Sequence, residues 1–356
     1  MVNFCSDNAS GAAPEILRAI EAANAGAAMP YGNDELTRRV EARLAEVFET
    51  EVAAFPVATG TAANALALSL MAPPFGAVYC HEAAHVQVDE CGAPEFYTGG
   101  AKLVPLPGAH GKIAAEDLAG AIAGEGVVHE VQPAAVSLTQ ASEAGTVYTA
   151  EEIGALAEVA RAHRLGLHVD GARFANAVAS LGCAPAEITW KAGVDALSFG
   201  ATKNGALGAE AVVLFKPVLA ATFGYRRKRG GHLFSKMRFL SAQLDAYLAD
   251  GLWLRHARHA NAMARRLSEG LAALPGVSLS HAVEANEVFA RLPEAMITGL
   301  LGEGFVFYRW GPHERREVRL VASFDTDPRD VDAFLAAARR LAEARGAGRR
   351  PGVAAS

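Results

Sequence analysis

Two segments of this chain end an apolar run in residues that can do chemistry. Leu165–Val169 leads into Asp170. Ala196–Phe199 leads into Thr202 and Lys203. In an open α/β sheet, ligands bind beyond the carboxyl ends of the strands. A lysine there can form a Schiff base with pyridoxal phosphate, and an aspartate can pair with the protonated pyridine nitrogen, so the pair predicts a site for that cofactor.

A third segment, Val57–Asn64, follows an expected strand and opens an expected helix. Free backbone amides at a helix start, the helix dipole and threonine hydroxyls together can hold a phosphate. Gly60 and Thr61 are the candidate contacts. A capped helix start without any ligand has the same pattern, and the chain lacks the GxGxxG and Walker motifs. The segment therefore supports a phosphate site only together with the two strand ends.

Two arginines and one histidine are candidates for the substrate side of such a site. Arg173 and Arg319 could hold a carboxylate through a planar guanidinium, although Arg319 in a strand could equally be a surface residue. His85 could lie flat on an aromatic cofactor ring or transfer a proton.

A metal site is the alternative from a different functional class. Cys80, His81, His85 and Cys91 are close in sequence, but their spacing matches no zinc pattern. A non-catalytic metal-binding protein that uses them would be colourless and would hold zinc. We therefore expect no metal at the catalytic site.

Composition restricts the class of protein. The chain has 356 residues, 51% of them hydrophobic, which suits a soluble α/β protein of two domains. A formal net charge of −6 gives no reason to expect nucleic acid as a partner. The four cysteines form no recognisable disulfide pattern, and neither a leader nor a long apolar run is evident. We expect a reduced, cytoplasmic protein that does not bind membranes.

Strands and helices are expected to alternate through the first two thirds of the chain. We expect an N-terminal arm at 1–33, a large domain at 34–245, a smaller α+β domain at 246–345 and a disordered tail at 346–356. A long helical stretch is expected from about Met237 to Leu274 and a final helix at Pro328–Arg345. The elements expected in the large domain are Val52–Pro56, Thr61–Met71, Gly76–Cys80, Ala84–Glu90, Lys102–Leu106, Ala134–Thr139, Ala150–Leu165, Leu167–Asp170, Ala196–Phe199 and Ala211–Phe215.

Taken jointly, the motifs resemble the threonine aldolase family of pyridoxal-phosphate enzymes. The branch is similar to the low-specificity L-threonine aldolases and the phenylserine aldolases. The resemblance implies the aspartate aminotransferase-like (type I) fold, with a mixed, mostly parallel seven-stranded sheet. The matching segments are Ser6–Asn8, Tyr31–Asp34, Gly60–Asn64, Ala84–Val86, Asp89–Phe96, His168–Phe174, Thr189–Asp195, Thr202–Gly205 and Ser235–Leu240.

The resemblance also implies roles for individual residues. Lys203 would form the Schiff base, Asp170 would pair with the ring nitrogen, and His85 would stack on the ring. The resemblance implies a homo-oligomer, a tetramer, whose subunits share their sites through a basic loop at Tyr225–Lys236. The implied cofactor contacts are Gly60, Thr61, His85, Gln140, Asp170, Arg173, Thr202, Lys203, Lys228 and Lys236, and the implied substrate contacts are Ser6, Tyr31, Arg173 and Arg319.

One departure from the family leaves the catalytic base open. Many relatives have Asn-Thr-His after the strand that ends here at Leu138, whereas this chain has Thr139–Gly145. The base is then His85, Glu143 or a water between them. We expect replacement of His85 to be the more damaging of the two.

The expected reaction is cleavage of L-threonine, L-allo-threonine and related β-hydroxy-α-amino acids to glycine and an aldehyde. A preference for aromatic substrates such as phenylserine is the alternative. Another pyridoxal-phosphate reaction, β-elimination or transamination, is the less favoured alternative. The reaction type depends on which bond at Cα is aligned for cleavage, and the sequence does not show that alignment.

Overall fold

The computed structural model describes residues 2–347. A seven-stranded sheet forms the centre of the large domain, in the order β1-β7-β6-β5-β4-β2-β3. Strand β7 runs antiparallel to β1 and β6, and the other neighbours pair in parallel, so the predicted mixed, mostly parallel sheet is confirmed. The strands are Ala53–Val57 (β1), Gly76–His81 (β2), Lys102–Leu106 (β3), Gln132–Thr139 (β4), Gly166–Gly171 (β5), Ala196–Gly200 (β6) and Glu210–Leu214 (β7).

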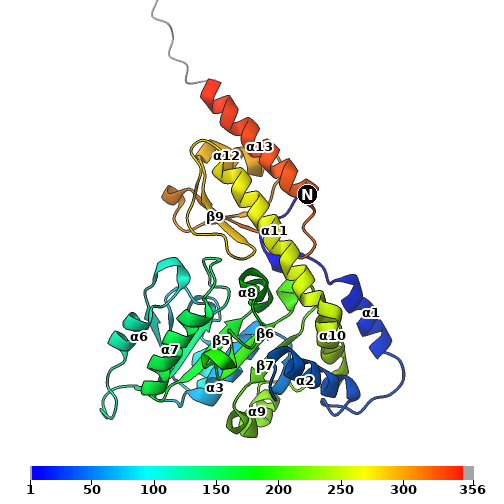
Figure 1. Cartoon of the computed structure of the whole chain (residues 1–356), viewed down its shortest axis with the longest axis vertical. Helices are drawn as coiled ribbons and strands as arrows, with labels where there is room; N and C mark the ends of the chain where they lie inside the picture. Colours follow the sequence, from blue (N-terminus) through cyan, green and yellow to red (C-terminus); the bar gives the residue numbers. More distant parts are fainter. Residues whose placement is uncertain (1, 348–356) are drawn as a thin grey trace, which may run out of the picture.

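Helices cover both faces of this sheet (Figure 1). Both faces of β2, β6 and β7 are buried, which explains why their sequences are continuous apolar runs rather than alternating ones. One face packs against α3 and α9, and the other against α2, α7, α8 and α10. The helices of this domain are Pro14–Ala23 (α1), Glu35–Phe48 (α2), Gly60–Met71 (α3), His85–Val88 (α4), Ala93–Thr98 (α5), Ala115–Ala121 (α6), Ala150–Ala162 (α7), Phe174–Leu181 (α8), Pro217–Arg229 (α9) and Arg238–Leu248 (α10).

A smaller domain rises from the large one and tapers away from it (Figure 1). Its antiparallel sheet has the order β10-β11-β9-β8 and packs against α11, α12 and α13. The elements are Leu252–Ala272 (α11), Ser278–Leu279 (β8), Glu287–Arg291 (β9), Glu294–Gly302 (α12), Tyr308–Trp310 (β10), Glu317–Val321 (β11) and Pro328–Ala347 (α13).

Several expectations from sequence need correction. The long helix expected over Met237–Leu274 is broken at Asp250 and Gly251, whose left-handed φ angles of 51° and 67° end α10 and start α11. The N-terminal arm does not simply lie on the large domain. Asn3 pairs with Val306, and Phe4 is buried in the core of the small domain.

The basic loop expected at Tyr225–Lys236 is helical in its first part, because α9 continues to Arg229. The final helix extends two residues beyond the expected end, and positions 348–356 of the expected tail lie outside the described residues.

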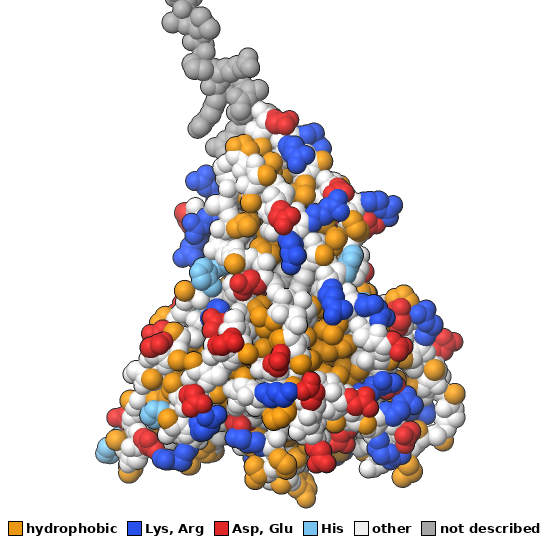
Figure 2. Space-filling view, in the orientation of Figure 1, with side chains coloured by type: hydrophobic (Ala, Val, Ile, Leu, Met, Phe, Trp, Pro, Cys, Tyr) orange, Lys and Arg blue, Asp and Glu red, His pale blue; other side chains and the backbone are white. Residues whose placement is uncertain are grey.

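Between residues 2 and 347, no helix is long and apolar enough to cross a membrane. On the face shown in Figure 2, acidic and basic side chains are interspersed, with no extended basic surface.

Candidate active site at the carboxyl edge of the sheet

The predicted reactive residues meet in one cavity of about 250 Å³ at the carboxyl ends of β1, β5 and β6. The ends of β5 and β6 approach closely there. A Cβ on Gly200 would lie 2.5 Å from the carbonyl oxygen of Ala172, so only glycine permits this packing. The lining residues include Gly60, Thr61, Asn64, His85, Glu143, Asp170, Arg173, Thr202, Lys203 and Glu210.

Asp170 is held by two hydrogen bonds. The Asn64 side-chain amide donates to Oδ2 at 2.8 Å, and the Ala172 backbone amide donates to Oδ1 at 3.0 Å. The same Asn64 amide donates to Glu90 Oε1 at 2.8 Å. Glu90 in turn lies 2.9 Å from Nδ1 of His85. A chain of hydrogen bonds therefore connects the strand-end aspartate with the histidine at the lip of the cavity.

His85 and Glu90 both have shifted pKa values, for different reasons. The hydrogen bond to Glu90 raises the pKa of His85, despite the opposing effect of burial. Burial raises the pKa of the Glu90 carboxyl, whose side chain is fully inaccessible. His85 is therefore protonated more readily than a free imidazole.

The four residues considered as metal ligands, Cys80, His81, His85 and Cys91, do not converge on one point. In residues 2–347, His85, Glu90 and Asp170 are the only acidic, histidine or cysteine side chains that converge within 4.8 Å as a group of three or more. Cys80, His81 and Cys91 are not members of that group. Its two carboxylates instead accept hydrogen bonds from the Asn64 amide.

The start of α3, where the phosphate cradle is expected, lines the same cavity. Thr59 caps the helix, its hydroxyl accepting from the Ala62 amide at 3.2 Å. A Cβ on Gly60 would meet no atom within 4 Å, so this turn borders open space in the cavity. The backbone amides of the first turn of this twelve-residue helix face open space, and such amides can bind an anion.

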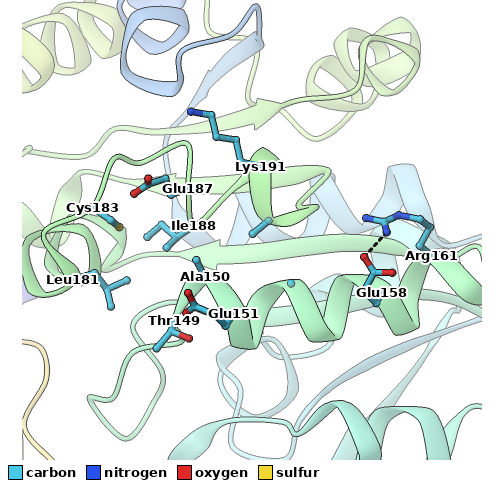
Figure 3. Close-up of a pocket in the computed structure, with 12 residues that line it drawn as sticks. Thr149, Ala150, Glu151, Glu158, Arg161, Leu181, Cys183, Glu187, Ile188 and Lys191 are labelled. Carbon is cyan, nitrogen blue, oxygen red and sulfur yellow. Dashed lines mark hydrogen bonds and ion pairs between the residues drawn. The ribbon is translucent and has the colours of Figure 1, made fainter.

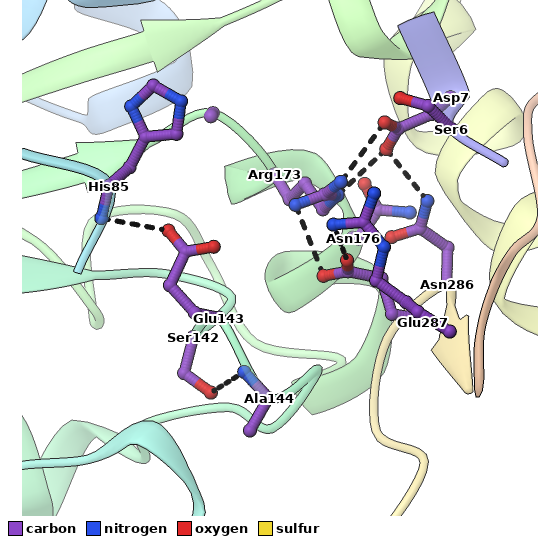
Figure 4. A network of polar contacts seen from close by, with 12 residues as sticks. Ser6, Asp7, His85, Ser142, Glu143, Ala144, Arg173, Asn176, Asn286 and Glu287 are labelled. Carbon is purple, nitrogen blue, oxygen red and sulfur yellow. Dashed lines mark hydrogen bonds and ion pairs between the residues drawn. The ribbon is translucent and has the colours of Figure 1, made fainter. Parts of the chain in front are cut away.

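Glu143 lies beside His85 on the wall of the cavity. The His85 backbone amide donates to Glu143 Oε1 at 3.2 Å (Figure 4). Burial raises the pKa of the Glu143 carboxyl, although the positive charges of Lys203 and Arg173 oppose this shift. A carboxyl group with a raised pKa is suited to proton transfer near neutral pH.

A second, larger cavity of about 670 Å³ adjoins the first and is also lined by Lys203, His85 and Glu143. Ser6 and Arg319 line this cavity as well. The Arg319 side chain is only 16% exposed, so Arg319 is not an ordinary, solvent-exposed surface arginine. Its guanidinium lies 4.5 Å from the ring centre of Trp310, and its buried Nε has no hydrogen-bond partner.

Arg173 lines both cavities but is already paired. Its Nε donates to Asp7 at 2.8 Å, and its Nη1 lies 3.1 Å from Glu287 (Figure 4). Although burial opposes it, the charge of Arg173 lowers the pKa of Asp7. This buried network joins the N-terminal arm, the large domain and the small domain at the site.

Four predicted site residues lie outside both cavities of this chain. Gln140 is the clearest correction, because its side-chain amide is bonded at both ends to the backbone of Tyr148, at 2.8 and 2.9 Å. Tyr31, Lys228 and Lys236 lie elsewhere on the exposed surface.

Sequence reasoning gave no role to Asp7, Asn64, Glu90, Glu210 or Glu287. Asp7, Asn64 and Glu90 lie within segments that carry the family resemblance, and this resemblance was the available signal for them. The roles of Asp7 and Glu287 depend on contacts with Arg173 from distant parts of the chain.

Another hollow, of about 640 Å³, lies between α7 and the loop that follows α8 (Figure 3). Its charged side chains have partners on the surface: Glu158 pairs with Arg161, and Lys191 pairs with Glu49. It has no converging set of reactive groups like that at the strand ends.

Known proteins resemble this chain over most of its length. Residues 3–295 match the family described as beta-eliminating lyase. The chain is 44% identical to the low specificity L-threonine aldolase of Pseudomonas sp. strain NCIMB 10558, covering 96% of this chain and 98% of the relative. It is 45% identical to the corresponding protein of Pseudomonas aeruginosa, covering 91% and 93%. The solved structure of Leishmania major threonine aldolase superposes with a TM-score of 0.91 at 28% identity, covering 96% of this chain and all of that one.

Proposed function

The chain belongs to the beta-eliminating lyase family and, within it, to the low-specificity L-threonine aldolases, and from this premise we propose how its residues carry out the reaction. It is a pyridoxal-phosphate-dependent lyase that cleaves L-threonine and L-allo-threonine to glycine and acetaldehyde. The convergence of Lys203, Asp170 and the start of α3 on one cavity is the observation that carries the proposal. Its four free cysteines agree with a cytoplasmic location.

The residues present fit the cofactor. Gly60 and Thr61 would hold its phosphate, Thr202 and Lys203 would lie beside its aldehyde, and Asp170 would pair with its ring nitrogen. Asn64 keeps the Asp170 carboxylate directed into the cavity. His85, oriented by its hydrogen bond with Glu90, would stack on the ring. When bound, pyridoxal phosphate supplies an electron sink for the bond that breaks at Cα.

The larger adjoining cavity receives the substrate carboxylate and side chain. Arg319 offers an unpartnered buried Nε for the carboxylate, with Ser6 beside it. Arg173 contributes a second guanidinium, held in place by Asp7 and Glu287. These groups fix which bond at Cα is aligned for cleavage, and the room in the cavity admits aromatic as well as aliphatic β-substituents.

Glu143 accepts the proton of the β-hydroxyl group in this proposal. His85 is less suited, because its hydrogen bond to Glu90 raises the pKa of the imidazole and so favours the protonated form. The Glu143 carboxyl lines both cavities and is held by a backbone amide. Removal of the hydroxyl proton accompanies cleavage of the Cα–Cβ bond and departure of the aldehyde.

Replacing Glu143 with glutamine should therefore lower kcat for L-threonine cleavage by at least about tenfold, since positioned proton transfer typically contributes 10²–10⁴-fold. The ionisation on the acid side of the kcat–pH profile should disappear with it. Steady-state rates between pH 5 and 9 measure both effects, and absorbance of the glycine complex shows that the cofactor is still bound.

Glu82→Gln is the matched control, because Glu82 lines the adjoining cavity but is exposed. It should retain the wild-type profile. If His85→Asn is the more damaging change and Glu143→Gln keeps the acid-side ionisation, then His85 is the base and this assignment is wrong.

In this proposal the active enzyme is a homotetramer, and each active site is formed by residues of two subunits. Tyr31, Lys228 and Lys236 lie away from both cavities of their own chain but close to one another. The Lys228 ammonium lies 5.0 Å from the Tyr31 ring centre, and the Tyr31 amide donates to Ser235 at 3.1 Å. Such an exposed basic and aromatic surface suits contact with the phosphate region of a neighbouring subunit.

Mixing two inactive variants tests the shared site. Lys203→Ala removes a residue from a subunit's own site, whereas Lys228→Ala removes one from its neighbour's. Refolding the two variants together should restore about a quarter of the wild-type sites, because random pairing gives one intact site in half of the dimers. No recovery in a mixture shown to hybridise, or full activity of Lys228→Ala alone, contradicts the shared arrangement.

A further inference from the structure

A buried glutamate lies at the phosphate end of the cofactor cavity. Glu210 is the first residue of β7, and its neighbours across the sheet are Val57 on β1 and Gly200 on β6. Those two strands lead into the start of α3 and the turn that carries Lys203. Glu210 thus lies between the phosphate cradle and the reactive lysine, lines the same cavity as both, and is only 7% exposed.

The surroundings of Glu210 provide little to balance a negative charge. Its Oε2 accepts the Ala201 backbone amide at 2.7 Å, and the other groups that lower its pKa are Thr202 and the charge of Lys203. From α10, the phenol of Tyr247 feels the Glu210 charge, which contributes to a raised Tyr247 pKa. Lys203 is the cation among the main influences on the Glu210 pKa, and in the proposed function it is the group that reacts with the cofactor aldehyde.

We propose that Glu210 takes up a proton when the phosphate of the cofactor binds, so that cofactor binding is coupled to protonation of this side chain. A phosphate ester carries about −1.5 to −2 charges at pH 7. Placing it beside a carboxylate that is largely shielded from water would set two anions against each other, which favours the neutral acid. The inference rests on the proposed placement of the cofactor.

The expected pH dependence has a definite sign. Burial raises the pKa of Glu210 to about 7 before any ligand is present. Below that pH the side chain is already protonated, and binding requires no proton uptake. Above it, each binding event takes up about one proton, so affinity should fall by about tenfold per pH unit.

Pyridoxine 5′-phosphate is the probe, because its alcohol cannot form a Schiff base with Lys203. Calorimetric titration of the apoprotein at pH 8, in two buffers of different ionisation enthalpy, counts the protons taken up. The wild type should take up about one proton more than Glu210→Gln, and the variant should bind the probe more tightly at this pH. Glu82→Gln removes an exposed carboxyl from the adjoining cavity and should keep the wild-type uptake.

Equal proton uptake by the wild type and Glu210→Gln overturns the inference. So does weaker binding by the variant with an unchanged pH dependence, which would mean a merely structural role for Glu210. If the variant does not fold, infrared difference spectra of the wild type decide, since binding must produce a new band from a protonated carboxylic acid. Failure of the wild type to bind the probe at any pH would instead contradict the proposed cofactor site.

Discussion

Replacement of Lys203 with alanine should abolish cleavage of L-threonine, with a loss of at least about 10³-fold in kcat, equivalent to about 4 kcal/mol. Lys203 lies on the turn after β6 and lines both cavities. In the proposed function it is the group that bonds covalently to the cofactor, and no neighbouring side chain can replace its amine. The cofactor should still bind through its phosphate and ring contacts, although less tightly.

Chemical trapping identifies the lysine independently of activity. Borohydride treatment of the cofactor-loaded wild type should attach the cofactor irreversibly to the peptide that contains Lys203, and mass spectrometry locates it. Lys203→Ala should give no labelled peptide. Lys191→Ala is the control, because Lys191 pairs with Glu49 on the surface, and it should behave as the wild type does. Label on a different lysine in the wild type refutes the assignment.

Replacement of Asp170 with alanine should leave a folded protein that retains less than about a tenth of the wild-type rate, a loss above 1.4 kcal/mol. Without the carboxylate, the neutral pyridine becomes the favoured form of the cofactor, and it withdraws electrons poorly. Asp170 also receives hydrogen bonds from Asn64 and Ala172, so alanine removes both the charge and these contacts.

Asp170→Asn separates these two contributions because it keeps the size of the side chain and removes its charge. It should be nearly as slow as the alanine variant, while thermal unfolding of the apoprotein stays closer to the wild type. If Asp170→Asn retains most of the wild-type kcat, the carboxylate charge has no role in catalysis.

The positions of the main reactive residues could be predicted because they depend on local pattern. An apolar strand followed by Asp170, and another followed by Lys203, place both at the carboxyl edge of a parallel sheet. The start of α3 was predictable for the same reason, since a threonine cap and glycine follow a strand. The seven strands follow from the same alternation of apolar runs and helices.

The remaining features depend on contacts between distant residues, which no local pattern contains. Arg173 was expected to hold substrate, but Asp7 and Glu287 come from the arm and the small domain to pair with it. Gln140 follows a strand end as Asp170 does, yet its amide bonds the backbone of Tyr148. The raised pKa of His85 likewise required knowing that Glu90 lies within hydrogen-bonding distance.

Identification of the products formed from L-threonine tests the central claim most directly. Purified, cofactor-loaded protein should release glycine and acetaldehyde in equal amounts, measured by amino acid chromatography and an alcohol dehydrogenase coupled assay. That outcome means that the bond between Cα and Cβ breaks. Release of ammonia and 2-oxobutanoate without glycine would mean elimination of the β-hydroxyl group instead, and would contradict the proposed aldolase function.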